Sequence, residues 1–445
     1  MNYYLKYRIN KKSIFELLNS NNNDYKQLNF YLDLSSIARG LYNKNLIILE
    51  VSNYLQNNKV LPTTFLNELR LFLNDLYNTF QYYHPRFIIF YDDGNNNQNK
   101  SISKGYKSNR VSASQSLVNH INSTPQVKQI FEAKKNIENY DQILNELNII
   151  KSEKIEAEKN DPRNIEFVKE LLELTSIDDE AKVKIQKKIL SNTIPLESID
   201  VQKDFGINDE IIQNQIKELQ EKINKRQSVV VKTTDPKDQL TGYQEEEFKN
   251  TFKLIKSYYF TEIENKFNIP GLSKVIYMQE YETDFVPYFY LNNGFESDNN
   301  LNIILSMDKD LLQCCKFKNT VQLTTNYLPS QSKIVTNIYD NENAISYIYD
   351  NFKKGILTAE YIPMILAISG DKADGISGVP GYGYANAIKS IMRNHITPEY
   401  PINVPAEFES FKEKLQKNYK MICFKEQISR LPLTTKIMLE QNLNF

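Results

Sequence analysis

The sequence has few of the residues from which zinc sites and disulfide frameworks are built. Its 445 residues include three cysteines, Cys314, Cys315 and Cys423, and three histidines. No CxxC pair occurs, and the histidines show no HExxH or similar spacing. We therefore expect neither a disulfide framework nor a zinc site, which is typical of proteins in the reducing cytoplasm. A metal ion in this protein would have to be held by carboxylates.

The sequence also lacks long apolar runs and an excess of charge of either sign. No stretch approaches the ~20 apolar residues of a membrane-spanning helix, so we expect a soluble, cytoplasmic protein without membrane contact. Lys and Arg number 54 against 55 Asp and Glu, which gives a formal net charge of -1. A nucleic-acid-binding protein often has a basic surplus, but acids gathered in one site would hide a basic track. Global charge therefore neither favours nor excludes a nucleic-acid partner.

Short apolar runs alternate with helical patterns near both ends of the chain. This alternation predicts an α/β core with a mainly parallel sheet flanked by helices. The expected strands are residues 28–32, 86–91, 274–278, 301–306, 320–325 and 333–339.

The middle of the chain, from about residue 112 to residue 243, has little strand character and much charge. Asp161-Pro162 predicts the start of a helix. Ile212, Ile216, Leu219 and Ile223 recur three and four residues apart and predict a helix with a narrow apolar seam. Such an insertion either packs on itself or grips a substrate or a partner, for example a replication protein. The predicted division is 1–112 and 244–350 for the two parts of the core, 113–243 for the helical insertion, and 351–445 for a C-terminal helical element.

Acidic residues follow four of the predicted strands, at the point where each strand ends. In an open α/β sheet the carboxyl ends of the strands line the ligand crevice. One such acid is often only a helix N-cap or turn residue, but four strands with acids at one edge are harder to explain in that way. The acids are Asp33, Asp92 and Asp93, Glu282 and Asp284, and Asp308 and Asp310.

Carboxylates that converge in one crevice repel one another by a few kcal/mol per close pair unless cations neutralise them. Hard oxygen ligands without His or Cys select Mg²⁺ or Mn²⁺. Such a cluster suits phosphodiester hydrolysis with two metal ions ~3.5–4 Å apart, which activate a water and stabilise the leaving oxygen.

Two further segments point to phosphate binding. Five of the 13 glycines fall between Gly370 and Gly383. Gly378, Gly381 and Gly383 would let backbone N–H groups approach a phosphate, next to the positive N-terminus of the following helix. The alternative is an ordinary tight turn, and Asp371 and Asp374 just upstream argue against it.

The second segment is basic. Lys104, Lys107 and Arg110 recur three residues apart, so we expect them to share one helical face beyond Asp92. They either form a solvated basic face or supply cations for the scissile phosphate.

Taken in order, these pieces resemble the flap endonuclease / 5′–3′ exonuclease family, which has a PIN-like fold. The resemblance is strongest to phage-type 5′ nucleases, including phage ribonuclease H-like members, and to the 5′ nuclease domain of bacterial DNA polymerases. It covers roughly residues 28–112 and 245–395. The matching motifs are Tyr31-Leu32-Asp33, Tyr91-Asp92, Tyr106-Lys107-Ser108-Asn109-Arg110, Glu282-Thr283-Asp284, Asp308-Lys309-Asp310, and Gly370-Asp371 through Asp374 to Gly383.

The resemblance implies a metal-dependent nuclease that hydrolyses DNA or an RNA–DNA hybrid, leaves a 5′-phosphate, and removes primers or flaps in replication. A phage-encoded member would act in the host cytoplasm. The implied ligands of two or more Mg²⁺ or Mn²⁺ ions are Asp33, Asp92, Glu282, Asp284, Asp308, Asp310, Asp371 and Asp374, all but the last of them also catalytic. Lys107 and Arg110 would contact the scissile phosphate at the base of a helical arch, and Lys104 would bind nucleic acid beside them.

The resemblance also assigns a helix–turn–helix element to residues 370–388. This element would hold the duplex backbone through Gly378, Gly381, Gly383 and Lys389, often around a monovalent cation such as K⁺ held by loop carbonyls.

Four features depart from the family pattern. Phe285 stands where many members have a further acid, Arg39 where an aromatic residue often stacks on a base, and Tyr384 where a basic residue is common. Arginine can still stack on a base. The stretch from Arg110 to Glu282 is also far longer than the arch region needs. Two other interpretations stay open: a PIN-like ribonuclease, and a non-catalytic scaffold in a replication complex.

Overall fold

The chain divides into two compact units. The computed structural model describes residues 11–19, 25–41, 44–56, 59–92, 97–103, 106–108, 112–123, 167–168, 170–171, 182–183, 185, 209–228, 240–328, 333–350, 352–353 and 355–443. One unit, here the core unit, comprises Met1–Ser116 and Phe248–Phe445, and the other, the insertion unit, comprises Leu117–Glu247. No helix in the described part of the chain has both the length and the apolar character needed to cross a lipid bilayer.

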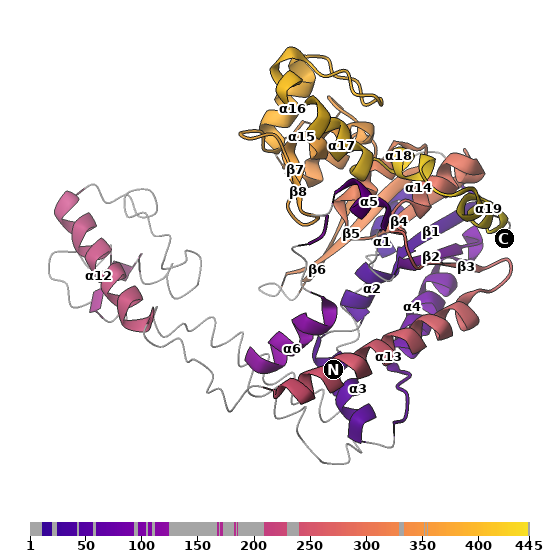
Figure 1. Ribbon diagram of the computed structural model, residues 1–445, viewed down its shortest axis with the longest axis horizontal. Coiled ribbons are helices and arrows are strands. Elements are labelled where there is room, and N and C mark those ends of the chain that lie inside the picture. The colour runs from indigo at the N-terminus through magenta and orange to yellow at the C-terminus, as the bar shows by residue number, and fades with distance from the viewer. Residues whose placement is uncertain are drawn as a thin grey trace. The chain divides into compact units, whose positions relative to one another are not determined.

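In the insertion unit the best described element is α12 (Glu210–Ser228) (Figure 1). Asp209 caps this helix, because its Oδ1 accepts a hydrogen bond from the backbone N of Ile212 at 3.2 Å. Ile216 and Leu219 of the predicted apolar seam are buried. Asp161-Pro162 and the side chain of Ile223 lie outside the described residues.

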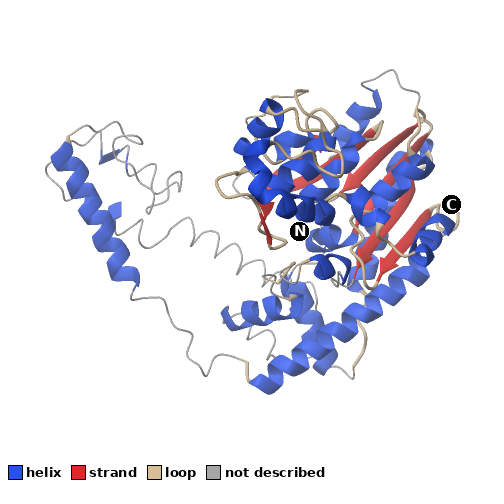
Figure 2. Cartoon of the chain, turned by 45° about the horizontal axis from the view of Figure 1, so that its top comes forward, coloured by secondary structure: helices blue, strands red, loops and turns tan. Residues whose placement is uncertain are grey.

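Six strands of the core unit form one sheet, drawn in red in Figure 2. Their spatial order is β3-β2-β1-β4-β5-β6. Strands β1 to β5 run parallel, and β6 runs antiparallel to β5. The strands are β1 (Gln27–Asp33), β2 (Arg86–Asp92), β3 (Ser273–Met278), β4 (Asn300–Leu305), β5 (Thr320–Leu328) and β6 (Lys333–Tyr339). All six predicted strands are present, and the predicted fold class is confirmed.

Successive residues of a strand point to opposite sides of the sheet, and successive residues of β1 are buried. Both faces of the sheet are therefore covered, and helices cover them. On one face Phe30 packs against Phe80 of α4 (Thr64–Phe80), with ring centroids 5.9 Å apart. On the same face Tyr91 packs against Phe260 of α13 (Gly242–Phe267), with ring centroids 4.5 Å apart. On the other face Tyr31 lies in a cluster with α14, α18 and α19. Other helices, with their bounds, are α1 (Lys11–Asn19), α2 (Leu34–Leu41), α3 (Lys44–Gln56), η1 (Gln81–Tyr83), α5 (Asn97–Ile102), α6 (Ala113–Ser123), α14 (Val286–Tyr290), η4 (Leu291–Phe295), η5 (Lys309–Lys316), α18 (Phe424–Ser429) and α19 (Leu433–Gln441).

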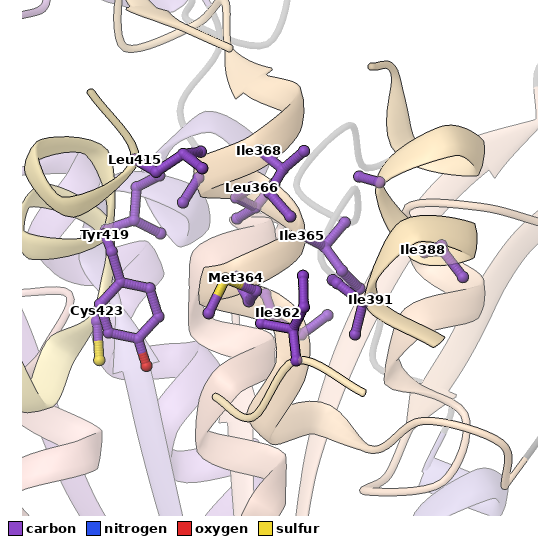
Figure 3. Close-up of a cluster of buried hydrophobic side chains, with 14 of the residues drawn as sticks. Ile362, Met364, Ile365, Leu366, Ile368, Ile388, Ile391, Leu415, Tyr419 and Cys423 are labelled. Carbon is purple, nitrogen blue, oxygen red and sulfur yellow. The ribbon is translucent and has the colours of Figure 1, made fainter. Parts of the chain in front are cut away.

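A second apolar cluster holds the C-terminal helices together (Figure 3). Helix α15 (Ile362–Ser369) is apolar all round and buried, as a helix at the centre of a core should be. It packs against α16 (Tyr384–Arg393) and α17 (Lys412–Ile422). Between α15 and α16 the short strands β7 (Gly370–Asp371) and β8 (Ile376–Ser377) pair as a hairpin. The element predicted over residues 370–388 thus begins with this hairpin and a loop and ends within α16, and the helix that precedes it, α15, ends at Ser369. The short helices η7 (Ala344–Tyr347), η8 (Ala359–Tyr361) and η9 (Ala406–Phe411) complete the unit.

One further carboxylate of the core unit, that of Glu50, is buried in the described part of the chain. Glu50 of α3 is 3% exposed, and its Oε2 accepts a hydrogen bond from the Tyr259 hydroxyl at 2.8 Å. Burial raises the pKa of Glu50 to about 7, although hydrogen bonds from Tyr259 and Thr64 oppose the shift. The protonated form is therefore the one that the folded chain favours.

This raised pKa predicts a pH dependence of stability. Below the ordinary pKa of 4.5 Glu50 is protonated in both the folded and the unfolded chain. As the pH rises from there through about 7, the unfolded chain releases the proton more easily than the folded chain, so the free energy of unfolding falls. The loss is on the order of 3 kcal/mol. In urea unfolding, Glu50→Gln should therefore be more stable than wild type at pH 8 by this order and much closer to it at pH 5. The exposed Glu264→Gln on α13 is the control, and equal differences at both pH values would contradict the assignment.

Candidate metal centre

Parallel pairing brings the acids of four strands to one edge of the sheet. Asp33 and Asp92 are the last residues of β1 and β2, and the register sets Asp33 beside Phe90 and Asp92 beside Met278. Leu32 pairs with Leu305, so Asp308 follows β4 at the same edge. Charge interactions join Asp284 to Asp308, Asp33 and Asp92, in that order of strength. We call Asp33, Asp92, Asp284 and Asp308 the first acid group.

Neutral donors hold Asp33 in place. Its Oδ2 accepts hydrogen bonds from the hydroxyls of Ser36 and Ser306, both at 2.6 Å. Its Oδ1 accepts a bond from the backbone N of Ser36 at 3.1 Å, so Asp33 also caps α2. The N-cap role and the place in the acid group are thus compatible.

Asp92 is tied to the loop that carries the next two acids. Its Oδ2 accepts hydrogen bonds from the backbone N and the hydroxyl of Thr283, at 3.2 and 3.4 Å. Glu282 and Asp284 flank Thr283. Both lie in the segment before α14, which begins at Val286.

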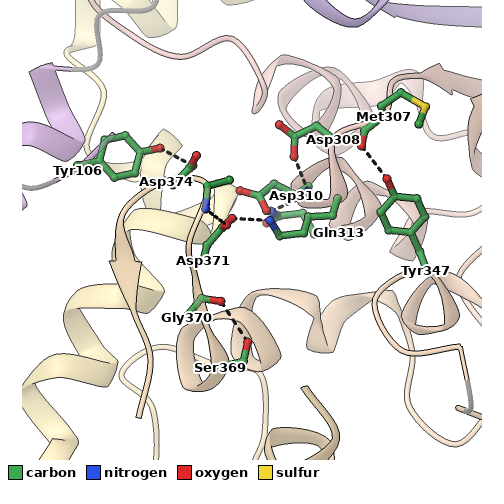
Figure 4. Close-up of polar contacts among 12 residues, drawn as sticks. Tyr106, Met307, Asp308, Asp310, Gln313, Tyr347, Ser369, Gly370, Asp371 and Asp374 are labelled. Carbon is green, nitrogen blue, oxygen red and sulfur yellow. Dashed lines mark hydrogen bonds and ion pairs between the residues drawn. The ribbon is translucent and has the colours of Figure 1, made fainter. Parts of the chain in front are cut away.

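A second acid group consists of Asp310, Asp371 and Asp374 (Figure 4). One carboxylate oxygen from each lies within 4.8 Å of the others. Asp310 is in the first turn of η5, which Asp308 caps by accepting a bond from the Asp310 backbone N at 3.0 Å. Asp371 belongs to β7 and Asp374 to the turn between β7 and β8. The hairpin of the C-terminal helices thus brings two acids to the strand ends.

Tyr106 connects the second acid group to Glu282. Its hydroxyl lies 2.8 Å from Glu282 Oε2 and 3.1 Å from Asp374 Oδ2, and it donates its single proton to one carboxylate at a time. Lys107 forms an ion pair with Glu282, and its backbone N donates to Asp374 O at 2.7 Å. Lys309 Nζ forms a further ion pair with Asp371 Oδ2 at 2.7 Å.

The acids in the two groups are difficult to ionise together. Burial and the neighbouring carboxylates raise the pKa of Asp284 and Asp310 well above the ordinary range, and that of Asp308 to a smaller extent. Burial alone would lower the pKa of Lys309, but Asp310 and Asp371 raise it overall. The seven acids of the two groups and Glu282 make eight carboxylates. If all eight are ionised, the ammonium groups of Lys107 and Lys309 balance two of the charges and leave six. Added cations would stabilise the ionised forms.

The residues present fit a hard divalent cation. Asp310 Oδ1 is buried and has no hydrogen-bond partner in the described part of the chain. A cation would satisfy this oxygen, and every donor in both groups is a carboxylate oxygen, the ligand that Mg²⁺ and Mn²⁺ prefer.

The basic segment differs from its prediction. Residues 106–108 form a turn, and Lys107 has a φ of 54°, in the left-handed region, so the predicted helical face is wrong here. Lys104, Arg110 and Asp93 lie outside the described residues. Arg39 lies in α2, where its side chain is not described, and Lys389 is exposed on α16.

The three glycines assigned to phosphate binding differ in their surroundings. A Cβ at Gly378 would lie 2.2 Å from Ser369 C, so the protein's own backbone requires glycine there. Gly381 has a φ of 79°, and at Gly383 a Cβ would meet nothing within 4 Å. Lys414 Nζ donates to Gly378 O at 2.6 Å. Gly381 and Gly383 therefore leave open space beside the N-terminus of α16.

Two residues of the site had no assigned role in the prediction, although both stand in its motifs. They are Lys309, between Asp308 and Asp310, and Tyr106, beside Lys107. Their partners lie far away along the chain, Asp371 for Lys309 and Glu282 and Asp374 for Tyr106. A local sequence pattern does not reveal such distant pairs. The Asp-Lys-Asp sequence is the one available hint.

Comparisons with known proteins were made for sequence and structure. No family model matches the chain. A DNA polymerase I of Caldicellulosiruptor bescii is 29% identical over 184 residues, which are 40% of this chain and 20% of that protein. The chain thus spans only about a fifth of the polymerase's length.

Two solved structures to which this chain is similar come from bacteriophage T5. One is a flap endonuclease in a pseudo-enzyme-product complex with DNA and metal ions, with a TM-score of 0.40, 10% identity, and coverage of 94% of this chain and 97% of that one. The other is a 5′-exonuclease with bound zinc ions, with a TM-score of 0.34, 11% identity, and coverage of 94% of each chain.

Proposed function

We propose that this protein is a metal-dependent, structure-specific 5′ nuclease that hydrolyses phosphodiester bonds in DNA or an RNA–DNA hybrid. The observation that carries the proposal is the meeting of two buried acid groups at the carboxyl ends of parallel strands, with Lys107 beside them. Flap or primer removal during replication is the task that the resemblance favours.

In this proposal each acid group holds one divalent ion, Mg²⁺ or Mn²⁺. Asp33, Asp92, Asp284 and Asp308 would hold the first, and Asp310, Asp371 and Asp374 the second, with Glu282 between them. Such ions lower the pKa of water and stabilise the charge that develops on the leaving oxygen. The protein contributes a buried arrangement of ligands that is already oriented by hydrogen bonds.

Lys107 is placed to act on the scissile phosphate together with Arg110. Its side chain is 16% exposed, so its charge is only partly screened by water. Substrate phosphate and Glu282 would compete for the same ammonium group. A cation at Glu282 would favour release of Lys107 towards the phosphate.

The loop before α16 is the proposed grip on the duplex. Gly381 and Gly383 would allow the backbone to approach a phosphate, and Lys389 adds a nearby exposed charge. A K⁺ ion would be held by carbonyl oxygens of this loop, of which Gly378 O already accepts a hydrogen bond from Lys414 Nζ. The presence of this element favours a DNA nuclease over a small PIN-like ribonuclease, and the complete set of acids argues against a vestigial core.

Replacement of Asp308 tests the acid groups. Asp308→Asn should keep the cap on η5, because Asn also caps helices, but it removes one charged ligand. Cleavage of 5′-labelled flap, nicked and single-stranded substrates in Mg²⁺ should fall by about a hundredfold or more. Asp298→Asn, at an exposed acid paired with Lys318, is the control. Wild-type rates in Asp308→Asn would reject the metal assignment, and a wild type inactive with both Mg²⁺ and Mn²⁺ would point to a non-catalytic scaffold.

Replacement of Lys107 separates catalysis from binding. A group that stabilises the transition state contributes to kcat more than to KM. Lys107→Met should therefore lower kcat on a flap substrate by about a hundredfold with little change in affinity. Lys389→Met should show the opposite pattern, with weaker duplex binding and nearly unchanged kcat. If both variants change only affinity, Lys107 serves to steer the backbone.

Replacement of Gly383 tests the duplex grip. A valine here meets no atom of the protein within 4 Å of its Cβ, and the φ of -74° is ordinary, so the fold should be retained. The branched side chain would nevertheless keep a phosphate away from the backbone. Gly383→Val should weaken binding of duplex-containing substrates by about tenfold, equivalent to 1.4 kcal/mol, and leave single-stranded binding unchanged. Gly242→Val, also at an open glycine, is the control; equal losses on both substrates would reject the role.

A further inference from the structure

We propose that the ammonium group of Lys309 is a built-in cation of the second acid group, which a divalent ion must displace from Asp371. The two acid groups would then take up metal ions with different affinities, the first group before the second. This inference rests on the proposed function, because it concerns the loading of the same site.

The backbone around Lys309 is fixed on both sides. Asp308 caps η5 through the backbone N of Asp310, and Gln322 Nε2 donates to Asp308 O at 2.7 Å. Gln313 Nε2 donates to Asp310 O at 2.8 Å. Lys309 thus begins a short helix whose start is held by several hydrogen bonds, and its side chain extends to Asp371 from a defined position.

Both carboxylate oxygens of Asp371 have partners within the protein. Oδ2 pairs with Lys309 Nζ at 2.7 Å, and Oδ1 accepts a bond from the backbone N of Ala373 at 3.0 Å. Asp371 is buried, with a side chain that is 5% exposed. A metal ion that uses Oδ2 would therefore meet the positive charge of the ammonium group at the same oxygen, and their repulsion favours displacement of Lys309. The buried Asp310 Oδ1 has no hydrogen-bond partner in the described part of the chain. In the second acid group Asp310 Oδ1 could thus accept a cation directly, whereas Asp371 Oδ2 already pairs with the Lys309 ammonium group.

The first acid group is arranged differently. The hydroxyls of Ser36 and Ser306 hold Asp33, and a backbone N–H holds Asp308. These donors are neutral. The charges of Lys107 and Lys309 do act on Asp284 and Asp308, but the described part of the chain places no ammonium group in an ion pair with Asp33 or Asp308, from which a divalent ion would have to displace it. A cation entering the second group is repelled by Lys309 until its side chain moves. The first group should accordingly bind its ion more tightly.

The test measures metal binding to the full-length protein without nucleic acid. Mn²⁺ is titrated by calorimetry, and free Mn²⁺ is counted by electron paramagnetic resonance. Wild type should show one tight and one weak site. Lys309→Met, which keeps most of the side-chain volume but removes the charge, should tighten the weak site about tenfold or more and leave the tight site unchanged. Lys309→Arg should keep the weak site weak.

Two controls define the sites. Lys318→Met, at a lysine that pairs with Asp298 and lies outside both acid groups, should change neither affinity. Asp371→Asn should remove the weak site and spare the tight one. An unchanged or weakened second site in Lys309→Met would overturn the inference, while intact Mg²⁺-dependent cleavage by wild type would leave the proposed function standing. A wild type that binds no Mn²⁺ would overturn both.

A measurement on wild type keeps the test valid if Lys309→Met does not fold. Reductive methylation followed by mass spectrometry reports how accessible each lysine amine is. Lys309 should be protected in the metal-free protein and become methylated once Mn²⁺ fills both sites, whereas the exposed Lys318 should react equally in both conditions. Protection of Lys309 that persists at saturating Mn²⁺ would show that the ammonium group is not displaced.

Discussion

Repulsion among carboxylates that are buried at one edge of a parallel sheet is the constraint on which the core unit depends. Parallel pairing of β1 to β4 sets the strand ends side by side, and the acids that follow these strands cannot move apart without a change of register. Burial first, and the neighbouring carboxylates after it, raise the pKa of Asp284, Asp308 and Asp310. The site is therefore built to receive positive charge, and the local fold has to hold it together before that charge arrives.

Two kinds of side chain hold the acid groups together. Neutral donors, the hydroxyls of Ser36, Ser306 and Thr283, fix the acids at the ends of β1 and β2 without consuming the negative charge. The lysines form their ion pairs elsewhere, Lys107 with Glu282 and Lys309 with Asp371. They reach Asp284 and Asp308 of the first acid group through charge interactions. Neutral donors leave the affinity for a metal ion nearly intact, whereas an ammonium group competes with it. The distribution of these partners is the reason to expect two metal sites of unequal strength.

Local patterns in the sequence predicted the six strands because each strand is a short apolar run bounded by polar residues, and the buried central strands are continuous runs. The acids at the strand ends followed from this, because parallel strands place their carboxyl ends together. What local patterns could not predict were pairings between distant residues. The partner of Lys309 is 62 residues further along the chain (371 minus 309), and the turn at Lys107 depends on a hydrogen bond to Asp374. Gly378 was assigned to phosphate, yet its lack of a side chain is required by the backbone of Ser369.

The hairpin of β7 and β8 connects the two halves of the proposed function. It contributes Asp371 and Asp374 to the second acid group, and the loop that follows it leads to Gly381, Gly383 and α16. Asp374 also accepts a backbone hydrogen bond from Lys107 and lies within hydrogen-bond distance of Tyr106. Under the proposed function, a duplex bound at the loop would be held by the same short segment that carries two of the proposed metal ligands and that accepts the backbone hydrogen bond of Lys107. Because α15 and α17 bury this segment's flanks in a continuous apolar cluster, the fold fixes the distance between the loop and the acid groups. A nuclease of the proposed kind would use such a fixed distance to select a substrate by where its duplex ends.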